Sequence, residues 1–182
     1  MKKYLLILIF TFCSSQTFAS FEDDVIRNLK SINNVSFVFE QNINGKTEKG
    51  SCFLEYPKKI YCEYDLANNK ILVSNGKSLV IKTKTSFYLY TLKKTPLNFI
   101  LDKKFLINRI NSLKGNLIDN KYINYNFTED ENEINIFFDK NSYNLIGWQT
   151  LDIYQNLSIT FLSSVQKNQD INKNLFILPK QN

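Results

Sequence analysis

Short segments in which apolar and polar residues alternate follow one another along most of the chain, with turn residues between them. The clearest pair is residues 50–56 and residues 59–64, which flank Pro57. Period two is the spacing of side chains on one face of a strand, so the pattern predicts antiparallel strands with one buried face. A hairpin symmetric about Pro57 places Cys52 opposite Cys62 on its apolar face.

The first residues have the layout of a secretory signal peptide. Two lysines precede an apolar run at residues 4–12, and small and polar residues then lead to Ala19. The run is shorter than the roughly 20 residues that a membrane span needs. A bulky residue precedes Cys13, which disfavours lipid attachment there. We expect residues 1–19 to be removed after Ala19, leaving one domain of residues 20–182 outside the cytoplasm.

The two opposed cysteines allow two interpretations. Opposed antiparallel positions have Cα atoms about 4.5–5.5 Å apart, within the range of a disulfide, and a secreted chain meets oxidising conditions. Cys52 and Cys62 fit equally well as small buried hydrophobic residues. A redox or metal-binding role is not expected, because the chain has no Cys-x-x-Cys motif and no histidine. The sequence leaves the disulfide and the reduced pair both open.

Helical signals occur at the start and in the middle of the mature chain. Ser20 is a candidate N-cap, and apolar residues recur at helical spacing over residues 21–32. Thr95 as cap and Pro96 as first helical residue predict a second helix start. Residues 103–113 are expected to extend it as a further helical piece.

About ten strands are expected around these helices. They predict a mainly β fold with helices (α+β), a strongly curved antiparallel sheet or open barrel with helices on or in its concave side. No change in composition divides the mature chain into two domains. The expected strands are residues 35–43, 50–56, 59–64, 70–73, 78–82, 87–92, 122–127, 133–138, 145–153, 157–164 and 175–178.

The composition argues against several classes of function. Without histidine there is no common general base, and neither a glycine-rich phosphate loop nor a metal-ligand cluster is present. Asp130 and Glu131 lie in an acidic, Asn-containing run that is typical of a solvated turn. Removal of residues 1–19 leaves 21 basic and 17 acidic residues, a net charge of +4. The lysines are scattered, so nucleic-acid binding is not expected. A binding or carrying protein without cofactor or metal fits better than an enzyme.

Several short motifs stand in a specific order along the chain: Phe39-Glu40-Gln41, Gly50, Tyr56-Pro57 before residues 60–64, Val73-Ser74-Asn75-Gly76-Lys77 and Thr95-Pro96. In order and spacing they resemble the periplasmic outer-membrane lipoprotein carrier family, LolA. The resemblance is strongest over residues 35–101. Toward the C-terminus it rests on Leu145, Trp148, Asp152 and Leu175-Phe176 before Pro179.

The resemblance implies an open, incomplete antiparallel β-barrel closed by a helical lid, with an apolar cavity for acyl chains. Such carriers take lipoproteins from an inner-membrane lipoprotein-releasing transporter and pass them to an outer-membrane acceptor protein or to the membrane itself. We expect a monomer with acylated lipoproteins as partners. The candidates for acyl-chain binding are Phe37, Phe39, Leu54, Ile60, Leu72, Leu97, Phe99, Ile100 and Trp148.

Three positions depart from the family pattern. Tyr56 stands where the family has an arginine before proline, a residue that tethers the lid to the barrel. A tyrosine can hydrogen-bond the backbone of a lid helix but supplies no charge-assisted hydrogen bond. Ile60 and Cys62 stand at aromatic positions on the cavity side. A disulfide between Cys52 and Cys62 would stiffen the cavity wall there.

Two other functions remain open on the sequence. A periplasmic binder of another lipid or hydrophobic small molecule would use the same architecture. A structural or interaction module with a filled core would show the same strand pattern, because every candidate lining residue is also an ordinary core residue.

Overall fold

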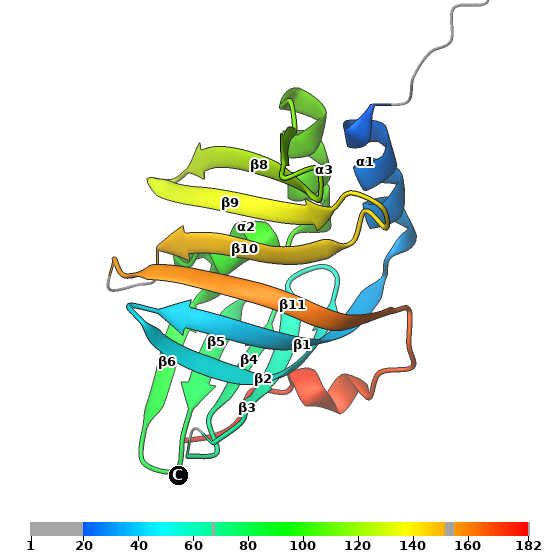
Figure 1. The fold of residues 1–182 in the computed structure, drawn as a ribbon. Coiled ribbons are helices and arrows are strands. Elements are labelled where there is room, and N and C mark those ends of the chain that lie inside the picture. The colour runs from blue at the N-terminus through cyan, green and yellow to red at the C-terminus, as the bar shows by residue number, and fades with distance from the viewer. Residues whose placement is uncertain (1–19, 67, 152–154, 182) are drawn as a thin grey trace, which may run out of the picture.

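The computed structural model describes residues 20–66, 68–151 and 155–181, and the expected signal peptide and cleavage site lie outside this part of the chain. Eleven strands in the described residues form one antiparallel sheet in the order β6-β5-β4-β3-β2-β1-β11-β10-β9-β8-β7. Strands β6 and β7 end the sheet and do not pair with each other, so the curved sheet of Figure 1 stays open. The prediction of an incomplete antiparallel barrel with helices is confirmed.

Most elements follow the order that the sequence pattern indicated. The strands are β1 Asn34–Ile43, β2 Lys46–Glu55, β3 Lys59–Tyr64, β4 Ile71–Asn75, β5 Ser78–Lys82, β6 Phe87–Thr91, β7 Asn116–Ile118, β8 Tyr122–Glu129, β9 Asn132–Asp139, β10 Leu145–Leu151 and β11 Leu157–Lys167. The helices are α1 Phe21–Ser31, α2 Leu97–Ile100 and α3 Lys103–Ser112, with 3₁₀ turns η1 Leu92–Lys94 and η2 Lys173–Phe176.

Helix α1 begins as its sequence indicates. The Ser20 hydroxyl accepts a hydrogen bond from the Asp23 backbone N–H, and acidic residues occupy the first turn, where they favour the positive end of the helix. Val25 and Leu29 are buried on its inner face. Asp102 caps α3 in the same way by accepting from the Phe105 N–H at 3.1 Å.

Tight turns set the register of the hairpins. Asn75 accepts hydrogen bonds from two backbone N–H groups, and Gly76 adopts a φ of +93°, so this Asn-Gly pair forms a tight turn between the expected strands at residues 70–73 and 78–82. At the preceding hairpin the Tyr56–Pro57 peptide bond is cis. Its register places Cys52 opposite Cys62, as hairpin symmetry predicts.

The two halves of the sheet have different interiors. Helices α1 and α3 contact each other beside strands β8–β10, as Figure 1 shows. The Phe105 ring on α3 lies 5.8 Å from that of Phe127, and the Tyr125 and Phe138 rings lie 5.9 Å apart. Side chains of the helices therefore fill this half, while a cavity lies within the half that β1–β6 form with β10 and β11.

The prediction of a last strand at residues 175–178 is wrong. Residues 173–176 form the 3₁₀ turn η2, in which Asn172 accepts a hydrogen bond from the Asn174 N–H. This turn contacts β3 and β4, and Phe176 is buried there. A four-residue apolar run is equally consistent with a strand and a turn, and packing against the sheet decides between them.

The middle helices also differ in detail from the expectation. Thr95 does not cap α2: its hydroxyl donates to the Leu92 carbonyl at 2.9 Å and so closes the turn η1. The short strand β7 was not predicted. The strand expected over residues 145–153 is confirmed as far as Leu151, and residues 152–154 lie outside the described part.

Candidate functional site

A cavity of about 680 Å³ lies inside the curve of the sheet. Its wall consists of inward-facing side chains of β1–β6, β10 and β11, together with residues 95–97 before and at the start of α2. Ligand sites of small molecules commonly measure roughly 300–1,000 Å³ and are mostly apolar with a few polar groups. The cavity therefore has the size and the construction of a ligand site.

Six of the nine candidate residues lie on this wall. They come from four strands and α2, and alternation along the strands directs the five strand residues to one side of the sheet. The Phe37 and Trp148 rings meet edge to face with centroids 6.4 Å apart. The candidates on the cavity wall are Phe37, Phe39, Ile60, Leu72, Leu97 and Trp148.

The structure places the other three candidates in the packed core, away from the wall of this cavity. Leu54 and Ile100 are fully buried, and the Phe99 ring packs on Phe105 at 5.1 Å. Helix α2 is a single turn, so Leu97 at its start reaches the cavity while its last two residues pack into the core. Leu54 faces the region of α1 instead of open space.

The Phe39 ring occupies space that a side chain at position 50 would fill, and this position is a glycine. Gly50 lies opposite Phe39 across β1 and β2. A Cβ atom at Gly50 would lie 2.0 Å from the Glu63 carbonyl oxygen and 2.8 Å from the Phe39 ring. The absent side chain leaves room for the Phe39 ring, which meets the Tyr64 ring edge to face with centroids 4.9 Å apart.

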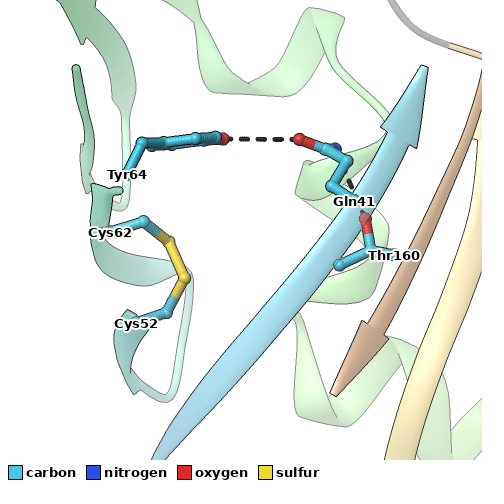
Figure 2. Close-up of a disulfide and its surroundings, with 5 residues drawn as sticks. All are labelled: Gln41, Cys52, Cys62, Tyr64 and Thr160. Carbon is cyan, nitrogen blue, oxygen red and sulfur yellow. Dashed lines mark hydrogen bonds between the residues drawn. A yellow bond between two sulfur atoms is a disulfide. The ribbon is translucent and has the colours of Figure 1, made fainter. Parts of the chain in front are cut away.

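Cys52 and Cys62 form a disulfide, and both residues line the cavity. Figure 2 shows the bond between β2 and β3, with Tyr64 near Cys62 and the Tyr64 hydroxyl directed away from the bond toward Gln41. The Cα atoms of the two cysteines are 4.1 Å apart. Of the two interpretations that the sequence left open, the structure has the disulfide.

The β2–β3 turn contacts the helices through more than Tyr56. The Lys103 ammonium of α3 lies 5.6 Å from the centre of the Tyr56 ring, and burial raises the pKa of the Tyr56 hydroxyl. The charged contact comes from Lys58, whose ammonium lies 3.1 Å from the Asp102 carboxylate and donates to the Asn98 side chain at 3.0 Å. Sequence reasoning missed Lys58, since one lysine in a turn has no distinctive spacing.

Polar residues in the cavity wall were also missed. Gln41 follows Phe37 and Phe39 on the inward face of β1 and donates hydrogen bonds to Ser158 and Thr160. A glutamine that interrupts an apolar alternation was a signal that could have found it. Burial raises the pKa of Tyr64, and the nearby Glu48 carboxylate raises it further.

Other classes of site receive no support from the described residues. In that part of the chain, no group of three or more His, Cys, Asp or Glu side chains is placed to hold a metal ion. None of the helices described is both long and apolar enough to cross a membrane.

The cavity and the open sheet agree with the comparison to known families. Residues 30–178 match the model of the family described as outer membrane lipoprotein carrier protein LolA. The chain belongs to the LolA family. The resemblance inferred from the order of the sequence motifs is thereby confirmed.

Individual relatives of this LolA family member are distant. An outer-membrane lipoprotein carrier protein of Francisella philomiragia is 34% identical over 88 residues, which are 44% of this chain and 43% of that protein. The match thus spans less than half of the relative. A conserved protein of Thermus thermophilus has the same fold, with a TM-score of 0.52 and 7% identity over 88% of this chain and 93% of that one. A LolA superfamily protein of Nitrosomonas europaea has a TM-score of 0.39 and 8% identity over 88% of this chain and 99% of that one.

Proposed function

We propose that this LolA family member is a periplasmic carrier whose cavity binds the acyl chains of lipoproteins and which transfers them from the inner to the outer membrane. The observation that carries the proposal is the cavity of about 680 Å³ with apolar side chains on most of its wall. A sheet with a fully packed interior would leave no such space, so the cavity argues against a module with a filled core.

A carrier that must release its ligand needs a cavity that recovers only part of the free energy gained when an acyl chain leaves water. Burial of one methylene is worth about 0.8 kcal/mol, so a chain of roughly 15 methylenes gains on the order of 12 kcal/mol on leaving water. A closed apolar cavity that recovered this gain in full would not release its ligand to a membrane. The wall here includes polar side chains such as Gln41 and Glu48 and reaches exposed residues such as Leu66, which supports weaker and reversible binding.

The remaining parts of the proposal follow from the family and the sequence. Residues 1–19 serve as a signal peptide, and residues 20–182 act as a single monomeric domain in the periplasm. The protein binds acylated lipoproteins without performing catalysis. An inner-membrane lipoprotein-releasing transporter supplies the lipoprotein, and an outer-membrane acceptor protein or the membrane receives it.

The first test is native mass spectrometry of the tagged mature protein captured from its own periplasm. Acylated lipoproteins in the bound fraction are the expected result. Free lipid alone would favour the second candidate, a binder of another lipid or hydrophobic small molecule. An empty protein that also excludes apolar dyes would contradict both.

A further inference from the structure

A band of polar side chains crosses the otherwise apolar wall of the cavity. Gln41 on β1 pairs with Glu48 on β2 and with Thr160 on β11, so the three positions are neighbours across the sheet. All members line the cavity, and Ser158 and Thr160 are 4% and 3% exposed. The polar band is defined as Gln41, Glu48, Lys70, Ser158 and Thr160.

The charged members of the polar band neutralise each other. The Lys70 ammonium lies 2.5 Å from the Glu48 carboxylate, and both side chains are less than one-fifth exposed. The same ammonium lies 4.0 Å from the centre of the Tyr64 ring. A buried pair with such contacts presents no net charge to a ligand, so the band does not favour an anion.

The hydroxyl groups of the polar band are arranged as donors. Gln41 Nε2 donates to Ser158 Oγ at 3.0 Å and to Thr160 Oγ1 at 3.3 Å. The Tyr64 hydroxyl donates to Gln41 Oε1 at 3.5 Å (Figure 2). Each serine or threonine hydroxyl has one proton of its own. Since both already accept from Gln41, their protons remain for an acceptor in the cavity.

The polar band lies between the apolar interior and the rim. Along β1 the inward residues run from Phe37 and Phe39, each 3% exposed, through Gln41 to Ile43. Next comes Lys46, whose side chain is 80% exposed. Residues two apart on a strand are separated by roughly 6.5 Å, so the polar band lies about one such step outward from the Phe39 ring.

We propose that the polar band binds the ester carbonyl groups of a diacylglyceryl ligand, with its acyl chains on the side of Phe37 and Phe39 and the rest of the ligand at the rim. Ester oxygens accept but do not donate hydrogen bonds, which matches the free protons of Ser158 and Thr160. A carbonyl taken from water into an apolar cavity without a donor would lose affinity. The inference rests on the proposed function, since it assumes an acylated ligand.

The test compares two synthetic ligands. One is an S-diacylglyceryl lipopeptide with two palmitoyl esters, and the other is its dialkyl ether analogue, which has the same chains without the carbonyl groups. The wild-type protein should bind the ester form about two- to tenfold more tightly, the range expected for one net hydrogen bond. Equal affinity for the two ligands in the wild-type protein would overturn the inference without any variant.

Variants of the polar band assign the preference to its hydroxyl groups. Thr160→Val and Ser158→Ala should each reduce the ester preference, and Thr160→Ser should restore it because it keeps the hydroxyl. The exposed residues Thr128 and Ser163 provide matched controls, Thr128→Val and Ser163→Ala, that should keep the preference. If Thr160→Val and Ser158→Ala weaken both ligands equally, the polar band is structural and the inference fails.

Two further outcomes separate this inference from the proposed function. If the folded wild-type protein binds neither ligand, the carrier function itself fails. If a diacyl phospholipid displaces the lipopeptide at equal concentration, the ester site stands but its natural ligand is free lipid. Preference for the lipopeptide over that phospholipid supports both.

Discussion

The Lys58 ammonium lies 3.1 Å from the Asp102 carboxylate and so joins the β2–β3 turn to the start of α3. The Lys58 backbone N–H also donates to the Leu101 carbonyl at 2.8 Å. The Lys58 carbonyl in turn accepts from the Ser74 hydroxyl at 2.8 Å. One residue thus connects the strands of the cavity wall to the segment between α2 and α3, and α2 begins at the cavity residue Leu97.

Replacement of this lysine should loosen the helices without unfolding the sheet. Lys58→Met removes the charged contacts to Asp102 and Asn98 and keeps an unbranched side chain. The side chains of the ion pair are about one-quarter exposed, so we expect a loss of about 1 kcal/mol or less in the free energy of unfolding. Hydrogen exchange should accelerate in residues 97–112 and stay unchanged in β8 and β9.

The control is the neighbouring ion pair of Lys59 with Glu55, at 2.6 Å on the same hairpin. Lys59→Met removes a lysine of similar exposure but leaves the contacts to α2 and α3 intact. Faster exchange of residues 97–112 in this variant as well would show that loss of any charge on the hairpin suffices, and the specific role of Lys58 would be lost.

A charge on the cavity wall should weaken acyl-chain binding. Leu97→Asp places a carboxylate where the cavity is apolar, and desolvation of this charge should weaken binding of a palmitoylated peptide by about tenfold or more. Leu89→Asp is the matched control: it is exposed on β6, where its neighbours Tyr88 and Tyr90 face the cavity. Equal binding by the two variants, measured by calorimetry, would contradict the assignment of Leu97 to the site.

The disulfide should contribute strongly to stability. It closes a loop with a sequence separation of 10, for which restriction of the unfolded chain is worth about 2–4 kcal/mol. A variant that combines Cys52→Ala with Cys62→Ala should lose this amount in urea unfolding. Dithiothreitol should destabilise the wild-type protein but not the variant. Titration of two reactive thiols in the native protein would contradict the bond.

Stability should fall at alkaline pH because of the buried tyrosines. Burial raises the pKa of Tyr64 above the usual value of 10.0, so the folded chain keeps the phenol proton more tightly than the unfolded chain. Its contribution is complete below pH 10 and is lost as the pH rises further. Tyr64→Phe should therefore show a shallower decline of unfolding free energy above pH 10 than the wild type does. Identical slopes in urea titrations between pH 8 and 11 would refute this.

Local signals account for the parts of the fold that the sequence predicted correctly. The Ser20 cap, the Asn75-Gly76 turn and the alternation around Pro57 each act within a few residues, so their outcome depends little on the rest of the chain. The register of Cys52 and Cys62 follows from one hairpin. The strand prediction for residues 175–178 was wrong because a distant contact decides the conformation there. Phe176 takes its place by packing on β3 and β4.

The site was predictable only in part for the same reason. Alternation shows that Phe37 and Leu54 both face inward, but it does not show what lies opposite each of them. Phe37 meets Trp148 beside the cavity, whereas Leu54 lies in the fully packed region near α1.

The positions of most strands along the chain, the hairpin turns and the inward-facing residues were thus encoded in short stretches of this chain. The division of the interior into a filled half and a hollow half was not, because it depends on where α1 and α3 pack. The same holds for the meeting of Gln41 with Thr160, and of Lys58 with Asp102. Such contacts join segments far apart in sequence, and only the folded sheet brings their side chains within hydrogen-bonding distance.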